Sequence, residues 1–148
     1  MAYILNIDTA TDICSVAVAN GDTVLAYREN GDGKTHAKTL LPFIEEALME
    51  IKLTPADLQA VAVSMGPGSY TGLRIGTSTA KGLCYSLGIP LIAVPTLQIM
   101  AAGAAKRHPA AQLFVPLMDA RRMEVFTCQY DIQLQALNEV ALTIESRV

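Results

Sequence analysis

Short runs of hydrophobic residues dominate the start of the chain, and they have the spacing of β-strands. Residues 3–8, 13–19 and 23–29 are rich in β-branched and aromatic side chains, which fit a pleated, half-buried surface. Asn20-Gly21 separates the second run from the third, and both residue types tolerate the positive φ angles of a tight hairpin. The pattern predicts three antiparallel strands.

The hydrophobic spacing becomes helical after Gly31. Apolar side chains recur across residues 35–51 at helical intervals, which predicts an amphipathic helix. Pro42 lies within this segment and is expected to kink the helix, because proline lacks an N–H group and crowds the preceding turn. The apolar stripe consists of Leu40, Leu41, Ile44, Leu48 and Ile51.

A second helix is predicted between two buried strands. Apolar runs at residues 60–63 and 91–94 flank a helical segment at residues 71–87. Gly88 and Pro90 end that segment, since glycine takes the left-handed cap and proline cannot continue a helix. Strand, helix and strand in this order predict a right-handed crossover in a sheet that is parallel at this point.

The remaining residues predict a third helix and a second β-rich unit. Thr96 is expected to cap a helix at residues 97–106. Strands are expected at residues 113–118 and 124–130, with a turn from Asp119 to Arg122 between them. Residues 131–148 are expected to form part of a further strand and a polar end.

The order β-β-β-α-β-α-β-α predicts an α/β fold with a mixed five-stranded sheet, which is the ribonuclease H-like topology. We expect a ribonuclease H-like N-terminal lobe at residues 1–108 and a partial second lobe at residues 109–148, starting with a β-hairpin. Two such lobes in tandem make the architecture of the actin, sugar-kinase and Hsp70 ATPases. The second lobe lacks a helix to cover its sheet, so we expect the chain to be truncated or to borrow its cover from a partner.

Composition narrows the class of protein. The chain has 148 residues, of which 51% are hydrophobic, and a formal net charge of −3, so electrostatics give no general reason to bind nucleic acid directly. It has no apolar run long enough for a membrane span and no signal peptide, so a cytoplasmic protein without membrane attachment is expected. The widely spaced Cys14, Cys84 and Cys128 are expected to be thiols of the core in a reducing compartment.

The predicted second helix contains Gly72, Gly76 and Gly82, although each interior glycine costs about 1 kcal/mol relative to alanine. Gly72 and Gly76 are four residues apart and share one face of the helix. That face either packs closely on the protein's own sheet or forms a flat docking surface for a second chain. A phosphate cradle at residues 66–69 is a weaker interpretation, because the Walker pattern is absent.

Three segments together resemble a known family. Ile7–Thr11 reads IDTAT, His36–Pro42 has the form His-x-x-x-Leu-Leu-Pro, and Gly66–Gly76 reads GPGSYTGLRIG. With the following GLCYSLGIPLIAV, these segments resemble the bacterial TsaB-type proteins across about the first 125 residues. Members of that family form the dimerisation subunit of the complex that makes threonylcarbamoyl-adenosine, next to the anticodon, in tRNA.

The resemblance implies a non-catalytic scaffold that pairs with a TsaD-type catalytic subunit. The helices at residues 35–51 and 71–87 would pack on the same pair of helices in that subunit. A TsaE-type ATPase would be a further partner, tRNA would be reached only indirectly, and the chain alone would form a homodimer. The implied interface residues are His36, Leu40, Leu41, Gly72, Leu73, Gly76, Thr79, Ala80 and Leu83.

The resemblance also implies that the chain has no metal of its own and is not an enzyme. The TsaD-type relatives carry His-His-Met-Glu-Gly-His, in which two histidines bind the metal, after the strand that matches residues 91–94. Here Thr96 and Met100 stand at the ligand positions, and a hydroxyl with a thioether cannot replace two imidazoles. ATP and metal are therefore expected on the catalytic partner. The alternative is an ATPase or a metal-dependent, protease-like enzyme of the same fold.

Other candidate groups have simpler explanations. Asp8 and Thr9 match the turn that places a carboxylate near Mg-phosphate in ATPases of this architecture, but an aspartate in a turn commonly bonds its own backbone. Asp119 would occupy the matching turn of the second unit. His36 is expected to be a packing or capping residue. Arg74, Arg121 and Arg122 either reach tRNA phosphate or form salt bridges with a partner.

Overall fold

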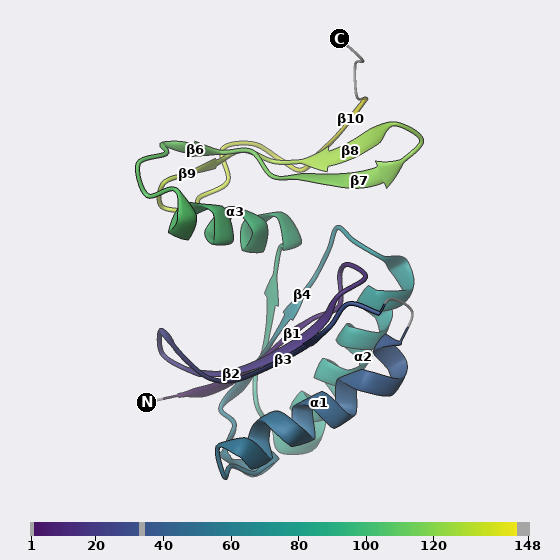
Figure 1. Ribbon diagram of the computed structural model, residues 1–148, viewed down its shortest axis with the longest axis vertical. Coiled ribbons are helices and arrows are strands. Elements are labelled where there is room, and N and C mark those ends of the chain that lie inside the picture. The colour runs from purple at the N-terminus through teal and green to yellow at the C-terminus, as the bar shows by residue number, and fades with distance from the viewer. Residues whose placement is uncertain (1, 33–34, 145–148) are drawn as a thin grey trace. The chain divides into compact units, whose positions relative to one another are not determined.

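A mixed five-stranded sheet forms the centre of the first of two compact units (Figure 1). The structure is a computed structural model that describes residues 2–32 and 35–144. The sheet has the order β3-β2-β1-β4-β5, with β1, β2 and β3 antiparallel and β4 and β5 parallel to β1. Its strands are β1 (Tyr3–Asp8), β2 (Cys14–Asn20), β3 (Thr23–Asn30), β4 (Ala60–Ser64) and β5 (Leu91–Val94). This confirms the predicted α/β, ribonuclease H-like sheet.

Two helices cover one face of this sheet. The helix α1 (His36–Glu50) packs over β2 and β3, and α2 (Tyr70–Leu87) packs over β4, beside α1. A short 3₁₀ turn, η1 (Pro55–Asp57), precedes β4. Both helices contribute to one hydrophobic core with the strands, so each has one buried and one outward face. The core includes Leu5, Ile7, Val16, Val61 and Val63 from the sheet with Leu40, Ile44, Ala80 and Cys84 from the helices.

Local sequence signals account for the ends of these elements. Ser69 caps α2, since its side chain accepts a hydrogen bond from the amide of Gly72. Gly88 ends the helix in the left-handed conformation with φ 67°, as predicted. Gly21 takes φ 57° in the turn between β2 and β3. The helix α1 continues without a break through Pro42.

The second unit comprises residues 66–68 and 95–148, as far as they are described. The helix α3 (Thr96–Arg107) contributes Leu97 to a small core. Leu97, Cys128 and Tyr130 are almost fully buried there. Burial raises the pKa of Tyr130 to about 12. A three-stranded sheet has the order β10-β8-β7, and β6 pairs with β9. These strands are β6 (Leu113–Phe114), β7 (Leu117–Arg121), β8 (Glu124–Thr127), β9 (Tyr130–Asp131) and β10 (Ala141–Ile144).

The division between the units differs from the predicted one. The helix α3 belongs to the second unit, so the division lies between Val94 and Pro95 instead of at residue 108. Thr96 was expected to cap α3, but Pro95 is the capping residue and Thr96 is the first residue of the helix. The buried Thr96 hydroxyl has no hydrogen-bond partner among the described residues.

The hairpin of the second unit also differs from the prediction. The expected strand at residues 113–118 is interrupted at Val115 and Pro116, and its two halves join different sheets. Asp119 lies within β7 and not in the turn, although its side chain accepts a hydrogen bond from the amide of Arg121 at 2.7 Å. The turn itself consists of Arg122 and Met123, because Arg121 pairs with Glu124.

A candidate docking surface and the turn beneath it

The turn between β1 and β2 is bonded to the first residues of both helices. The hydroxyl of Thr9 donates to the carbonyl oxygen of Gly72 in α2 at 2.7 Å. The carbonyl oxygen of Ala10 accepts from the amide of Ser69, the capping residue of α2, at 2.7 Å. The carbonyl oxygen of Thr11 accepts from Nε2 of His36, the first residue of α1, at 2.8 Å. The turn therefore holds α1 and α2 together at one end of the sheet.

The glycine face of α2 lies against this turn. A Cβ atom on Gly72 would overlap the carbonyl oxygen of Thr9, and a Cβ atom on Gly76 would overlap the Thr9 hydroxyl. Both glycines are buried, and Thr9 has no exposed surface. Of the two interpretations of this face, close packing on the protein's own sheet is therefore correct for Gly72 and Gly76. A Cβ atom on Gly82 would have no neighbour within 4 Å.

Most of the implied interface residues are not on the surface. His36, Leu40, Gly72, Gly76 and Ala80 are buried in the first unit, and this part of the prediction is corrected. They are buried because they lie on the faces of α1 and α2 that pack on the sheet. Leu41 is exposed, as the prediction requires, and the partly exposed residues are Leu73, Thr79 and Leu83.

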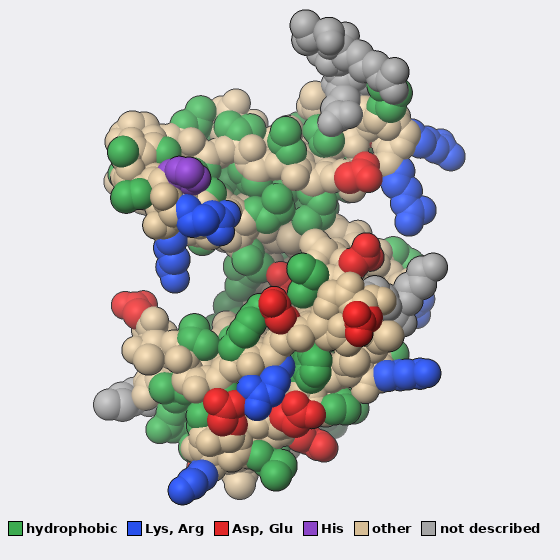
Figure 2. All heavy atoms as spheres, in the orientation of Figure 1, with side chains coloured by type: hydrophobic (Ala, Val, Ile, Leu, Met, Phe, Trp, Pro, Cys, Tyr) green, Lys and Arg blue, Asp and Glu red, His purple; other side chains and the backbone are tan. Residues whose placement is uncertain are grey.

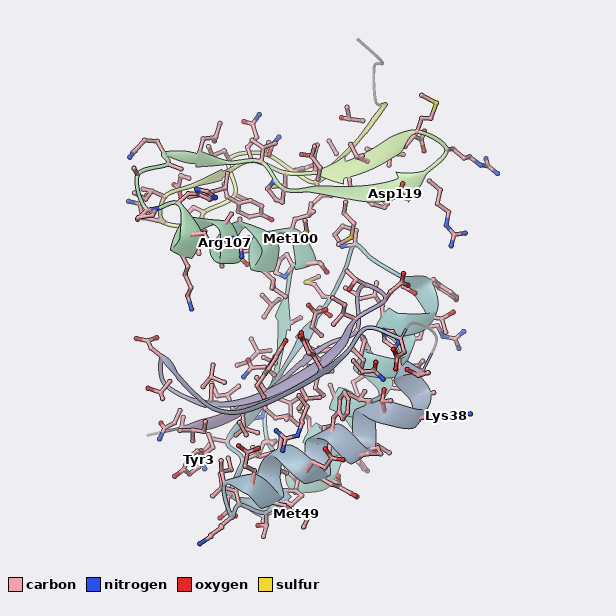
Figure 3. All side chains as sticks on the ribbon, viewed as in Figure 1. Tyr3, Lys38, Met49, Met100, Arg107 and Asp119 are labelled. Atoms are coloured by element: carbon pink, nitrogen blue, oxygen red, sulfur yellow. The ribbon has the colours of Figure 1, made fainter. Side chains whose placement is uncertain are left out.

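The outward faces of α1 and α2 carry large exposed apolar side chains instead. The exposed fractions are 55% for Leu41, 75% for Met49, 75% for Tyr70 and 93% for Tyr85. Met49 lies near the end of α1 (Figure 3). We call this surface the helix-pair surface, and define it by Leu41, Glu45 and Met49 of α1 with Tyr70, Arg74, Ser78, Lys81 and Tyr85 of α2.

The sequence analysis missed Tyr85, Tyr70 and Met49. Helical spacing contained a signal for part of this set, because Arg74, Ser78, Lys81 and Tyr85 follow one another at intervals of four, three and four residues. This stripe lies opposite the glycine face. The glycine spacing placed the predicted interface on the inner face of the helix, although the exposed aromatic side chains lie on the outer face.

The charged groups beside α1 differ from those on α2. Arg28 of β3 forms ion pairs with Glu46 at 3.3 Å and Glu50 at 2.6 Å, on the side of α1 away from α2. Acidic and basic side chains gather over α1 in Figure 2. On α2, the guanidinium of Arg74 lies over the ring of Tyr70, 5.5 Å from its centroid. The α2 part of the helix-pair surface therefore combines aromatic and basic groups.

The turn that was predicted to lie near a nucleotide phosphate has several of its amides bonded within the protein. The amide of Thr9 donates to the hydroxyl of Ser64 at 3.4 Å, and the amide of Ala10 donates to Oδ1 of Asp8 at 3.0 Å. The amide of Ile13 donates to the hydroxyl of Thr11 at 3.2 Å. Asp8 thus bonds its own backbone in the manner of an Asx-turn, and buried Thr9 has its hydroxyl engaged with α2.

No metal-binding cluster is present in the described ranges 2–32 and 35–144, where no group of three or more His, Cys, Asp or Glu side chains has suitable geometry. Thr96 is buried at the start of α3, and Met100 is 38% exposed. Cys14, Cys84 and Cys128 are buried free thiols. Burial raises the pKa of Cys14 and of Cys84, which disfavours reactive thiolates at these positions.

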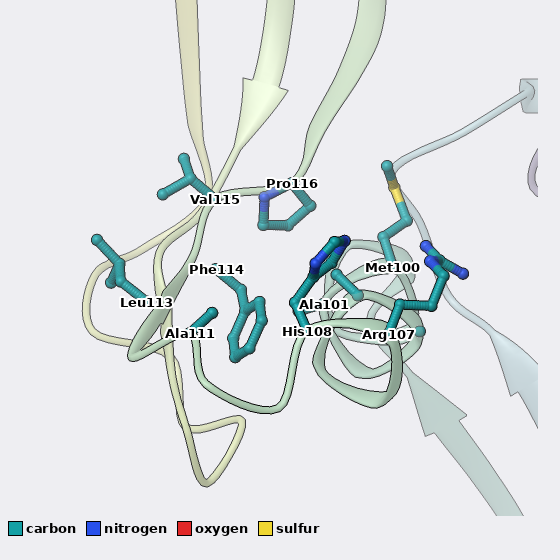
Figure 4. Close-up of a pocket in the computed structure, with 11 residues that line it drawn as sticks. Met100, Ala101, Arg107, His108, Ala111, Leu113, Phe114, Val115 and Pro116 are labelled. Atoms are coloured by element: carbon teal, nitrogen blue, oxygen red, sulfur yellow. The ribbon is translucent and has the colours of Figure 1, made fainter.

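A groove of about 580 Å³ lies in the second unit beside α3 (Figure 4). Phe114 and Pro116 contribute to an apolar lining, and the ring of His108 points toward Pro116. Arg107 and His108 are the charged or titratable residues of its lining, and they lie at the end of α3. Basic groups at this end of a helix complement its free carbonyl groups, so their position has a structural explanation.

The fold places the first unit in the ribonuclease H-like class shared with the actin-, sugar-kinase- and Hsp70-type ATPases. Component A of (R)-2-hydroxyglutaryl-CoA dehydratase from Acidaminococcus fermentans has a similar fold, with a TM-score of 0.59 and 14% sequence identity over 97% of this chain and 48% of that one. In the part of the chain that the structure describes, the helices are too short or too polar to cross a lipid bilayer.

A family model and a solved structure each match most of this chain. The family model TsaD, described as tRNA N6-adenosine threonylcarbamoyltransferase, matches residues 30–144. The structure named YeaZ from Pseudomonas aeruginosa superposes with a TM-score of 0.89 and 32% identity, over 100% of this chain and 70% of that chain.

Two proteins named tRNA threonylcarbamoyladenosine biosynthesis protein TsaB are also similar to the chain. The protein of Escherichia coli K12 is 40% identical over 127 residues, and that of Bacillus subtilis 168 is 39% identical over 137 residues. The matches cover 86% and 93% of this chain. They span 54% and 58% of these two relatives, so the chain corresponds to little more than half of their length. The chain belongs to the TsaB/YeaZ family.

Proposed function

We propose that this chain is a non-catalytic docking subunit in the synthesis of threonylcarbamoyladenosine in tRNA. Its partner would be the TsaD-type catalytic subunit, which would bind the helix-pair surface. The exposure of Leu41, Met49, Tyr70 and Tyr85 on adjacent helices carries this proposal. Aromatic side chains that are surrounded by other contacts are the commonest sources of binding energy in protein interfaces.

The names of the relatives support a role in threonylcarbamoyladenosine biosynthesis. Proteins similar over most of this chain are named for threonylcarbamoyladenosine biosynthesis, and the matching family model is that of the transferase itself. A TsaE-type ATPase would join the pair in the cytoplasm, and tRNA would be contacted through the catalytic subunit. Without that subunit, the same surface would form a homodimer.

We further propose that ATP and metal belong to the catalytic partner. Thr96 and Met100 offer a hydroxyl and a thioether where the resemblance places imidazoles, and these groups are poor ligands for a hard or borderline metal. Thr9 is buried, and the amides of Thr9 and Ala10 are bonded to protein oxygens. The alternative is an ATPase or a metal-dependent protease, and an ATPase would need this turn to rearrange before its bonded amides could reach a phosphate.

Calorimetry with the purified chain tests the proposal. We expect the TsaD-type subunit of the same organism to bind the chain, and ATP with Mg²⁺ to give no heat of binding when titrated into the chain alone. Failure to bind the catalytic subunit would contradict the docking role. Tight nucleotide binding with hydrolysis by the chain alone would favour the ATPase instead.

Matched variants locate the surface. Tyr85→Ala removes an aromatic side chain that is 93% exposed, so the fold should be unaffected while affinity for the catalytic subunit falls by about tenfold or more. Val24→Ala is the control, because Val24 is 60% exposed on β3 and lies outside both the hydrophobic core and the helix-pair surface. Equal affinities for both variants would show that the partner binds elsewhere.

A further inference from the structure

One buried side chain in the turn between β1 and β2 forms a hydrogen bond to α2. Thr9, Ala10 and Thr11 of that turn form hydrogen bonds to the starts of the two helices. Thr9 is the residue among them that uses its side chain, which bonds to α2. We propose that Thr9 is a positioning residue, whose hydroxyl sets the distance of α2 from the sheet and thereby aligns the helix-pair surface for its partner. This inference rests on the proposed function.

The hydroxyl allows a closer approach to a carbonyl oxygen than a methyl group of similar size does. The Thr9 hydroxyl oxygen lies 2.7 Å from the carbonyl oxygen of Gly72 because a hydrogen bond joins them. A methyl group in its place would need about 3.3 Å or more to the same oxygen. Valine, which has nearly the shape of threonine, would therefore push α2 outward by about half an ångström or more.

The helix α2 has no flexible side chain at this contact that could absorb such a shift. Gly72 and Gly76 bring the helix backbone directly against Thr9, and Ala80 continues the same buried face. Closely packed interiors transmit small displacements instead of absorbing them. A displacement of α2 at Thr9 would therefore move the outward stripe that contains Tyr85.

The helix α1 has its own bond to the same turn. Nε2 of His36 bonds the carbonyl oxygen of Thr11, two residues after Thr9. Replacing Thr9 leaves this bond intact, because it uses the backbone of Thr11. A change at Thr9 would thus displace α2 relative to α1, and a partner that contacts both helices would detect the difference.

Two substitutions separate the hydroxyl from the methyl group of Thr9. Thr9→Val keeps the bulk and removes the hydrogen bond, whereas Thr9→Ser keeps the hydroxyl and removes the methyl group. We expect Thr9→Val to bind the catalytic subunit about tenfold more weakly, and Thr9→Ser to bind as the natural chain does. Thermal unfolding of both variants shows whether they are folded at the temperature of the binding experiment.

A purely structural role would give a different result. Affinity would then follow stability, and Thr9→Ser would be impaired whenever its loss of packing lowered the melting temperature as much as Thr9→Val does. Equal binding by Thr9→Val and the natural chain would overturn the inference. Failure of the natural chain to bind at all would instead overturn the proposed function.

A double-mutant cycle with Tyr85→Ala gives a second, independent readout. If Thr9 acts through the position of α2, the effect of Thr9→Val should shrink when Tyr85 is absent, since coupled residues are not additive. Additive effects would contradict the inference. This comparison also decides the matter if Thr9→Ser proves too unstable for binding measurements.

Discussion

Gly76 of α2 packs against Thr9 so closely that a Cβ atom at residue 76 would overlap the threonine hydroxyl. Gly82, six residues further along the same helix, has open space at the same position. We therefore expect substitution by alanine to have opposite effects on stability at these two positions.

We expect Gly76→Ala to destabilise the first unit by about 1–3 kcal/mol, because overpacking outweighs the gain in helix propensity. Gly82→Ala should leave the unit unchanged or stabilise it by up to about 1 kcal/mol. Urea unfolding followed by circular dichroism measures both. A tolerated alanine at residue 76 would show that α2 is free to move away from Thr9.

We expect a double substitution in the hairpin turn of the second unit to stabilise that unit. Arg122 and Met123 form its two-residue turn with φ angles of 53° and 62°, which disfavour residues other than glycine, asparagine and aspartate. The double substitution Arg122→Asn with Met123→Gly should raise the stability of this unit by about 1–2 kcal/mol. Thermal unfolding tests this, and the matched control is Arg122→Gln, which removes the same charge but keeps a residue type that disfavours positive φ. A gain in the control of equal size would assign the effect to the lost charge.

The buried thiol of Cys14 predicts a dependence on pH. Burial raises its pKa above the ordinary value of 9.0, so the folded state favours the neutral thiol. The unfolded chain ionises first as the pH rises, and stability contributed by this group is therefore full below pH 9.0 and declines above it. Unfolding experiments between about pH 8 and pH 10.5 should show a smaller decline for Cys14→Ala than for the natural chain. Identical pH profiles would contradict this assignment.

The ion pairs of Arg28 predict a dependence on salt. Arg28 joins β3 to α1 through Glu46 and Glu50, but all three side chains are partly exposed. We expect Arg28→Met to lower the melting temperature slightly at low salt, with the difference from the natural chain vanishing near 1 M NaCl, where the Debye length is about 3 Å. A difference that persists at high salt would show that packing of the arginine stem is responsible.

Sequence patterns predicted most of the first unit, because each of its signals is local. The hairpin at Gly21 and the left-handed Gly88 both act within a few residues of their own position. The turn at Arg122 and Met123 gave no such signal, since neither residue type favours positive φ. Its strands were therefore placed with the wrong boundary.

The orientation of α2 was harder to predict than its existence. Helical spacing shows that Gly72 and Gly76 share a face, but it does not show which face meets the sheet. That choice depends on contacts with residues far away in the sequence, such as Thr9, which lies more than sixty residues earlier in the chain and bonds Gly72 directly. Helical spacing also does not show that Tyr70 and Tyr85, on the opposite face, are exposed.

The internal bonding of the turn between β1 and β2 also has a kinetic consequence. The amides of Thr9 and Ala10 and the carbonyl groups of Ala10 and Thr11 have partners inside the chain, so the start of each helix is bonded to the turn before any other molecule arrives. A rigid, ready-made contact area loses little conformational entropy upon association. Recognition by α1 and α2 should therefore resemble the docking of two preformed bodies, with a rate set by diffusion and orientation instead of by folding.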